Sequence, residues 1–319
     1  MTSESEGIHR LWLIDAATGQ SRLLREVSGI DAMFPVGWTG DESITCMDLA
    51  REPDQPSTIS VTTFSSGGST TRKIGEFTGW PGQHVATPDG RYFAVHLSAP
   101  EGGKVWRLDT FDGSSADLLS GLPTWDGLFP VWFSPDGRSA VMPEPKEDSD
   151  LQRLRLLNLE NAAVTSIDPY FEIIDHVAWS PGGARFAHKV AAGDYRTVEA
   201  GDSYMVLSRN IRVITSEGKV LREIALPQGC LVGAVAWIDD ESLVLRESTD
   251  AQDVSGPIWF ARVSGELRQA SPGEAQAFDR EQRPYPMAKG RSDRFEVSVR
   301  TWQDPGKAPS EELIVAPLE

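Results

Sequence analysis

The chain has 319 residues, of which 39% are hydrophobic and 24% are charged, a balance typical of a folded protein rather than a disordered one. Its formal net charge of −17, from 30 basic and 47 acidic side chains, argues against nucleic acid or an anionic membrane as a partner. The longest apolar run, LVGAVAWI at 231–238, is too short to span a bilayer.

The first residues, MTSESEGIHR, contain neither the basic stretch nor the apolar run of a secretory signal. The two cysteines, Cys46 and Cys230, cannot build a disulfide framework. We therefore expect a cytoplasmic protein.

A pattern of apolar run, turn and second apolar run recurs along the chain, and a Pro-Asp-Gly or Pro-Gly-Gly turn between the runs predicts a β-hairpin. The copies are GWTGDESITCMD (37–48), GQHVATPDGRYFAVHL (82–97), GLFPVWFSPDGRSAVMP (127–143), DHVAWSPGGARFAH (175–188), AWIDDESLVLRE (236–247) and the degenerate PYPMAKGRSDRFEVSV (284–299). Their equivalent positions before the turn are Trp38, Ala86, Phe133, Trp179, Trp237 and Met287, spaced by 48, 47, 46, 58 and 50 residues. We expect the aromatic residues at this position to pack between neighbouring repeats.

After each complete hairpin, two more runs rich in β-branched and aromatic residues predict a third and a fourth strand, and no segment shows a sustained helical period. Four strands per repeat of this length are typical of propeller blades. We predict an all-β, six-bladed β-propeller that forms one domain, residues 1–319. The predicted blades are 31–77, 79–122, 125–170, 171–227 and 229–273, with a sixth made of 1–24 and 274–319 that closes the ring. The role of the strand-like segment 312–318 stays open.

The pattern Trp/Phe-Ser-Pro-Asp/Gly-Gly, clearest at 133–137 and 179–183, resembles the WD-like repeat of TolB-type β-propellers. It is also similar to the propeller of prolyl-oligopeptidase-family peptidases, but no Gly-x-Ser-x-Gly motif or hydrolase domain accompanies it. The resemblance implies a fold and leaves the function open, because this scaffold serves docking, ligand binding and several chemistries.

Propellers bind small molecules at the mouth of the central channel, where the connections from the fourth strand to the next blade converge. Aromatic, acidic and basic residues fall on these predicted connections or beside them, the mixture that a ligand pocket needs. The candidate ligand-binding residues are Trp80, Trp125, Asp31, Phe34, Phe129, Tyr195, Arg196 and Arg283.

Candidate catalytic residues are His176, Asp175 and Asp126, with His176 as a general acid or base beside a carboxylate. Cys230 lies on the equivalent connection of the next blade, but small apolar packing is a commoner fate for such a cysteine than nucleophilic catalysis. No HExxH, EF-hand or Walker motif occurs, so the sequence predicts no metal site and no cofactor.

The longest insertion, residues 191–209, falls between the second and third strands of its blade, and its aromatic and flexible residues are typical of a lid or a docking surface. Two functions stay open. One is a binding module for a small ligand or a protein at the channel mouth. The alternative is a metal-independent enzyme of lyase, isomerase or cyclase type that uses His176.

Overall fold

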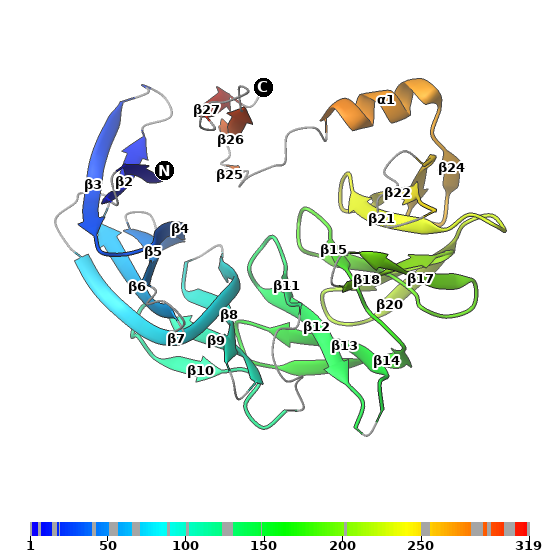
Figure 1. The fold of residues 1–319 in the computed structure, drawn as a ribbon, viewed down its shortest axis with the longest axis horizontal. Coiled ribbons are helices and arrows are strands. Elements are labelled where there is room, and N and C mark those ends of the chain that lie inside the picture. Colours follow the sequence, from blue (N-terminus) through cyan, green and yellow to red (C-terminus); the bar gives the residue numbers. More distant parts are fainter. Residues whose placement is uncertain are drawn as a thin grey trace. The chain divides into compact units, whose positions relative to one another are not determined.

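The structure is a computed structural model that describes residues 2–5, 8–14, 18, 20–39, 43–50, 57–65, 71–87, 90–99, 102–122, 130–147, 149–200, 203–249, 256–281, 290–291, 295–302 and 310–317. The chain divides into two compact units, Met1–Trp12 with Leu23–Gln269 and Leu13–Arg22 with Ala270–Glu319, and each is described by itself. Most of the described strands belong to the first unit (Figure 1).

Among the described residues, the first unit contains five groups of four antiparallel strands in chain order, which we call the first to fifth sheets. The first and second share one long strand and so form a continuous seven-stranded sheet, and a hairpin extends the fifth to six strands. The first sheet holds β4 (Ala32–Thr39), β5 (Ser43–Ala50), β6 (Ser57–Ser65) and the first half of β7 (Thr71–Ala86). The second holds the rest of β7, β8 (Tyr92–Ala99), β9 (Gly102–Asp109) and β10 (Ser115–Asp117). The third holds β11 (Trp132–Phe133), β12 (Ser139–Pro145), β13 (Gln152–Asn158) and β14 (Val164–Phe171).

The fourth sheet holds β15 (Val177–Trp179), β16 (Arg185–Lys189), β19 (Asn210–Thr215) and β20 (Val220–Ala225). The fifth holds β21 (Val232–Trp237), β22 (Ser242–Glu247), β23 (Ile258–Arg262) and β24 (Leu267–Gln269). These sheets follow the order of the five complete predicted blades, although β7 crosses the predicted boundary between 77 and 79 and β14 ends one residue past 170. The all-β class and the four-stranded antiparallel repeat are thereby confirmed.

The repeated turns share one geometry. The N–H of Gly137 donates to the Ser134 carbonyl at 2.9 Å, and the N–H of Gly183 donates to the Ser180 carbonyl at the same distance. In both turns the serine hydroxyl also accepts the N–H group five residues further on, at 2.9 and 3.2 Å. Both glycines have a positive φ, 67° and 73°, a backbone conformation that residues with a Cβ atom adopt only at a steric cost. This explains why the chain repeats the motif.

The tryptophan before the turn links successive sheets. Trp179 Nε1 donates to the carbonyl oxygen of Trp132 at 2.9 Å, and Trp237 Nε1 donates to that of Ala178 at 2.9 Å. In each case the donor lies in the first strand of one sheet and the acceptor in the first strand of the preceding sheet. The expected packing of these aromatic residues between repeats is confirmed at these two positions.

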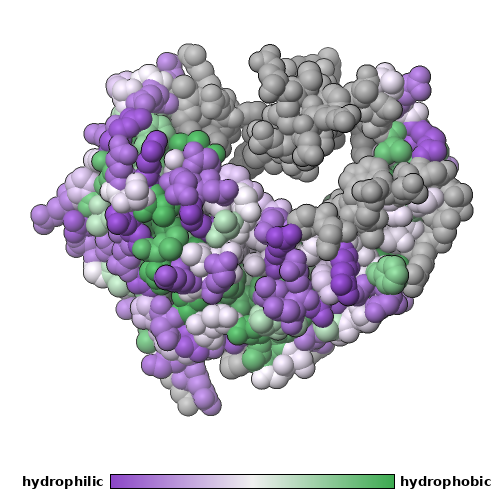
Figure 2. Space-filling model, turned by 180° about the vertical axis from the view of Figure 1, so that it is seen from behind, coloured by the Kyte–Doolittle hydropathy of each residue, from purple (hydrophilic) through white to green (hydrophobic). Residues whose placement is uncertain are grey.

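Apolar clusters fill the spaces between successive sheets. Ile59 of the first sheet packs in one cluster with Phe93 of the second, and Leu156 of the third packs with Phe186 of the fourth. Similar clusters join the second sheet to the third and the fourth to the fifth. The described side chains on the face shown in Figure 2 are mostly hydrophilic, and the hydrophobic ones form small separate areas.

Strand β7 departs from the prediction. It is continuous from Thr71 to Ala86 and pairs with β6 in its first half and with β8 in its second. The connection expected between the predicted blades 31–77 and 79–122 is therefore part of a strand, which has a register shift between Pro81 and His84. A β-bulge accounts for this, because it turns a strand without ending it.

The insertion forms a hairpin of β17 (Tyr195–Ala200) and β18 (Ser203–Ser208). β18 pairs with β21 through Ser208 and Val232. The hairpin therefore extends the fifth sheet, although in the chain it lies between β16 and β19 of the fourth sheet.

The strands of the two chain ends fall in two separate three-stranded sheets. β1 (Thr2–Ser5), β2 (Ile8–Ile14) and β3 (Ser21–Ser28) form one. β25 (Gly290–Arg291), β26 (Phe295–Trp302) and β27 (Ser310–Pro317) form the other. Residues 312–317 of the segment whose role the sequence leaves open belong to β27, which pairs with β26. The sixth blade and ring closure therefore stay predictions.

One helix corrects the expectation that no segment is helical. It is α1 (Pro272–Glu281). The Ser271 hydroxyl accepts the N–H of Glu274 at 3.4 Å, and the Glu274 carboxylate accepts the N–H of Ser271 at 2.9 Å. This is a capping box with proline at the first helical position, which is a sequence signal for the start of a helix. The helix was not predicted because it is too short to show a sustained hydrophobic periodicity.

Candidate functional site

The connection from β14 to β15 and the hairpin β17–β18 meet at one edge of the fourth sheet, which we call the loop edge. Glu172, Asp175 and His176 lie on that connection, and Tyr195 begins β17. The Tyr195 hydroxyl donates to Glu172 Oε2 at 2.5 Å, a bond that raises the pKa of Tyr195. Tyr195 is half-buried and Glu172 is exposed. The hydrogen bond therefore holds the hairpin against the connection.

A buried ion pair lies beneath the loop edge. Asp175 Oδ2 is 2.7 Å from Lys189 Nζ, and the two side chains are only 8% and 3% exposed. Asp175 Oδ2 also accepts the N–H of Val206 at 2.8 Å, while Lys189 donates to the Gly233 carbonyl at 2.8 Å. Burial lowers the pKa of Lys189, and Asp175 partly offsets this effect. The pair thus ties β16, β18 and β21 to the connection.

His176 follows Asp175 in the chain and is exposed. Its ring centroid lies 6.3 Å from that of Trp132, with the two rings almost perpendicular. Desolvation lowers the pKa of His176, and the nearby Lys189 lowers it further against a smaller opposite effect of Asp175. Near pH 7 the imidazole is therefore neutral, with one nitrogen able to donate and the other able to accept a hydrogen bond.

Two other predicted residues lie elsewhere. Phe34 is on β4 in the first sheet, 39% exposed, and its ring centroid is 5.7 Å from that of His84. Asp31 precedes β4, is exposed, and donates its backbone N–H to the Leu49 carbonyl at 2.7 Å. The structure thus places Asp31 and Phe34 on the first sheet, whereas His176 lies on the fourth.

Arg196 belongs to the loop edge. It is exposed on β17 and donates to the carbonyl oxygen of Thr249. Trp80 lies within β7, where the structure describes its backbone. Trp125, Asp126, Phe129 and Arg283 lie outside the described residues.

Cys230 does not have the features of a nucleophile. Burial raises the pKa of its thiol, and the carboxylate of Glu247 raises it further. The same Glu247 accepts a hydrogen bond from Trp259 Nε1 at 2.6 Å. A raised thiol pKa leaves little thiolate, the reactive form, near neutral pH.

Sequence reasoning missed Lys189 and Trp132, which shape the site as much as the predicted residues do. The signal for Lys189 was a single lysine within the otherwise apolar run FAHKVAA at 186–192, because a lysine is rarely buried without a partner. Trp132 gave no comparable signal. Its neighbour Phe133 occupies the repeated aromatic position, and either residue of such a pair can face the next sheet.

Several solved structures have a fold similar to that of this chain. An oligogalacturonate lyase in complex with manganese has a TM-score of 0.51 at 11% sequence identity, over 86% of this chain and 74% of that one. The β-propeller domain of the Trilobed protease from Pyrococcus furiosus has a TM-score of 0.48 at 12% identity, over 88% and 82%. TolB from Acinetobacter baumannii has a TM-score of 0.38 at 15% identity, over 82% and 59%.

The likeness to these proteins lies in the fold alone, and TolB and a protease β-propeller domain are among them, in line with the resemblance found in the sequence. This chain spans only 59% of the length of the TolB structure. No protein-family model matches the chain, and no curated protein sequence matches it either.

No helix in the described part of the chain is long and apolar enough to cross a membrane. No group of three or more His, Cys, Asp or Glu side chains in these residues is arranged to hold a metal ion.

Proposed function

We propose that this chain is a β-propeller module that binds a small ligand or a protein partner at the loop edge, without catalysing a reaction. The observation that supports binding over catalysis is the engagement of Asp175. Its Oδ2 atom contacts the Lys189 ammonium and the Val206 N–H, so this oxygen is not available to exchange protons with a substrate.

The groups above the buried pair suit recognition. His176 presents a neutral donor and acceptor, Glu172 presents a carboxylate, and Arg196 presents a cation, all from exposed positions. The Tyr195–Glu172 hydrogen bond and the Asp175–Lys189 pair hold these groups in place. Preorganisation of this kind reduces the ordering that a partner would otherwise have to induce.

Metal-independent catalysis of lyase, isomerase or cyclase type is the second candidate, and the lowered pKa of His176 favours it. A neutral imidazole at pH 7 is a competent general base. That mechanism also needs a carboxylate near the reacting atoms, and Glu172 is an exposed carboxylate at the loop edge.

Metabolite capture on the purified full chain tests the proposal. We compare the wild type with His176→Ala and Arg196→Ala, and we use Arg138→Ala as the control because Arg138 is exposed and pairs with Glu160 on the third sheet. The proposal predicts a compound retained unchanged by wild type and control and lost from both loop-edge variants. Retention by His176→Ala would contradict it, and turnover of the compound by wild type alone would establish the enzymatic alternative.

A further inference from the structure

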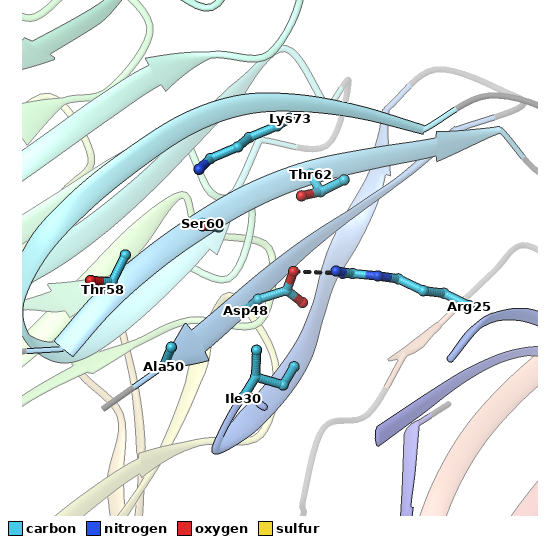
Figure 3. A pocket seen from close by; sticks show the side chains of 8 residues that line it. All are labelled: Arg25, Ile30, Asp48, Ala50, Thr58, Ser60, Thr62 and Lys73. Carbon is cyan, nitrogen blue, oxygen red and sulfur yellow. Dashed lines mark hydrogen bonds and ion pairs between the residues drawn. The ribbon is translucent and has the colours of Figure 1, made fainter. Parts of the chain in front are cut away.

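A pocket of about 330 Å³ lies on the first sheet, apart from the loop edge (Figure 3). Its volume is at the lower end of the range for small-molecule sites. The strands β3, β5, β6 and β7 and the segment before β4 supply its lining, which is Arg25, Ile30, Asp48, Ala50, Thr58, Ser60, Thr62 and Lys73.

Strand register creates the polar wall of this pocket. Side chains two residues apart share one face of a strand, so Thr58, Ser60 and Thr62 project from β6 together. Ser60 lies opposite Asp48 of β5, and Thr62 lies opposite Lys73 of β7. The result is a row of three hydroxyl groups with a carboxylate on one side and an ammonium group on the other.

Asp48 has one satisfied and one unsatisfied oxygen. The residue is only 5% exposed, and its Oδ2 accepts a hydrogen bond from Arg25 Nη1 at 2.5 Å. Its Oδ1 atom is buried and has no hydrogen-bond partner. Figure 3 shows Asp48 between Arg25 and the hydroxyl row, at the centre of the lining. A buried carboxylate oxygen without a donor is costly, so the site calls for a donor from a bound molecule.

The surrounding charges restrict what that molecule is. A cation is disfavoured because Arg25 and Lys73 both line the pocket. An anion is disfavoured because Asp48 is buried there and Glu76, which pairs with Lys73 and accepts from Ser60 at 3.4 Å, lies next to it. A neutral molecule with several hydroxyl groups avoids both repulsions, since each hydroxyl both donates and accepts.

We propose that this pocket binds a neutral polyhydroxylated molecule, a sugar of one or two rings or a cyclic polyol. One of its hydroxyl groups donates to Asp48 Oδ1, and its other hydroxyls exchange hydrogen bonds with Ser60 and Thr62. Ile30 and Ala50 supply apolar contact for its C–H groups. This site is independent of the loop edge and of the function proposed there.

Saturation-transfer NMR on the full chain tests this proposal. The probes are D-glucose, D-mannose, myo-inositol and maltose, with D-glucuronate as the anionic and D-glucosamine as the cationic comparison. The test variants are Ser60→Ala and Thr62→Val, which remove one hydroxyl each. The control is Thr63→Val, because Thr63 faces the opposite side of β6.

We expect at least one neutral probe to bind the wild type and Thr63→Val, and to bind each test variant at least tenfold more weakly. The loop-edge variant His176→Ala should bind that probe as the wild type does. Absence of transfer to every neutral probe, binding that Ser60→Ala and Thr62→Val leave unchanged, or equal binding of the charged probes would overturn the proposal.

Discussion

Asp175 and Asp48 are both buried carboxylates, but their surroundings differ. At the loop edge, Asp175 contacts a buried ammonium group and a backbone N–H, and the polar groups there join three strands. In the first sheet, Asp48 has one oxygen on Arg25 and the other buried without a donor. Asp175 therefore serves to stabilise the fold, whereas Asp48 has a free acceptor for the ligand that we propose.

Removal of one partner from the Asp175–Lys189 pair should cause the largest loss of unfolding free energy among the variants considered. Asp175→Leu leaves a buried ammonium without its counter-charge, a change that typically costs about 3–5 kcal/mol of unfolding free energy. Urea unfolding measures this loss. The double variant Asp175→Leu with Lys189→Met should recover most of it, whereas a single variant that loses under about 1 kcal/mol would show that the pair has no structural role.

The repeated turn offers a sharper test of the scaffold. A Cβ on Gly137 would lie 2.1 Å from the Ala86 carbonyl oxygen, and the residue has a positive φ. We expect Gly137→Ala to cost about 2–3 kcal/mol, since strain and a backbone clash act together. Gly29 is the matched control, because its φ is also positive but no atom lies within 4 Å of its added Cβ. Equal losses in both variants would contradict the packed turn.

Two buried histidines, His188 and His96, should make the stability of the protein depend on pH. Burial lowers the pKa of His188 from 6.5 to about 3 and that of His96 to about 4. Below pH 6.5 the unfolded chain binds protons that the folded chain does not, so stability falls as the pH drops from 6.5 toward these values. Each histidine contributes a slope of about 1.4 kcal/mol per pH unit. His188→Gln should flatten the profile measured by urea unfolding, and an unchanged slope would refute this assignment.

The hydroxyl row should give the smallest effect on stability. Ser60→Ala and Thr62→Val keep the strand and remove one hydroxyl group each, and the hydrogen bond from Ser60 to Glu76 is long, at 3.4 Å, so each variant should change the unfolding free energy by less than about 0.5 kcal/mol. Thermal unfolding checks this. A loss above about 2 kcal/mol in either variant would place that hydroxyl in the structural framework.

The sequence predicts the scaffold better than the sites, for physical reasons. The turns at Gly137 and Gly183 need glycine and a serine hydroxyl, so local sequence marks every clear hairpin. The continuity of β7 depends instead on its pairing with β6 and β8, which no local pattern reveals. The helix α1 was predictable in principle from Ser271, Pro272 and Glu274.

The sites were harder to predict because they depend on partners far apart in the chain. His176 and Asp175 were proposed as one acid–base group, but Lys189 and Val206 engage the carboxylate. The pocket at Asp48 depends on Arg25, 23 residues away on another strand. Nothing in an alternating strand such as STISVTTFS tells a solvent-facing hydroxyl row from one that lines a pocket.

The most direct test of the account is the melting temperature of Thr58→Val/Ser60→Ala/Thr62→Val beside the wild type, each with and without the neutral sugar that NMR selects. A ligand at a hundred times its dissociation constant stabilises a protein by about 2.7 kcal/mol. The account predicts that the sugar raises the melting temperature of the wild type, and that the variant melts at the same or a higher temperature without sugar and does not respond to it. A variant that keeps the sugar response, or a wild type without one, would contradict it.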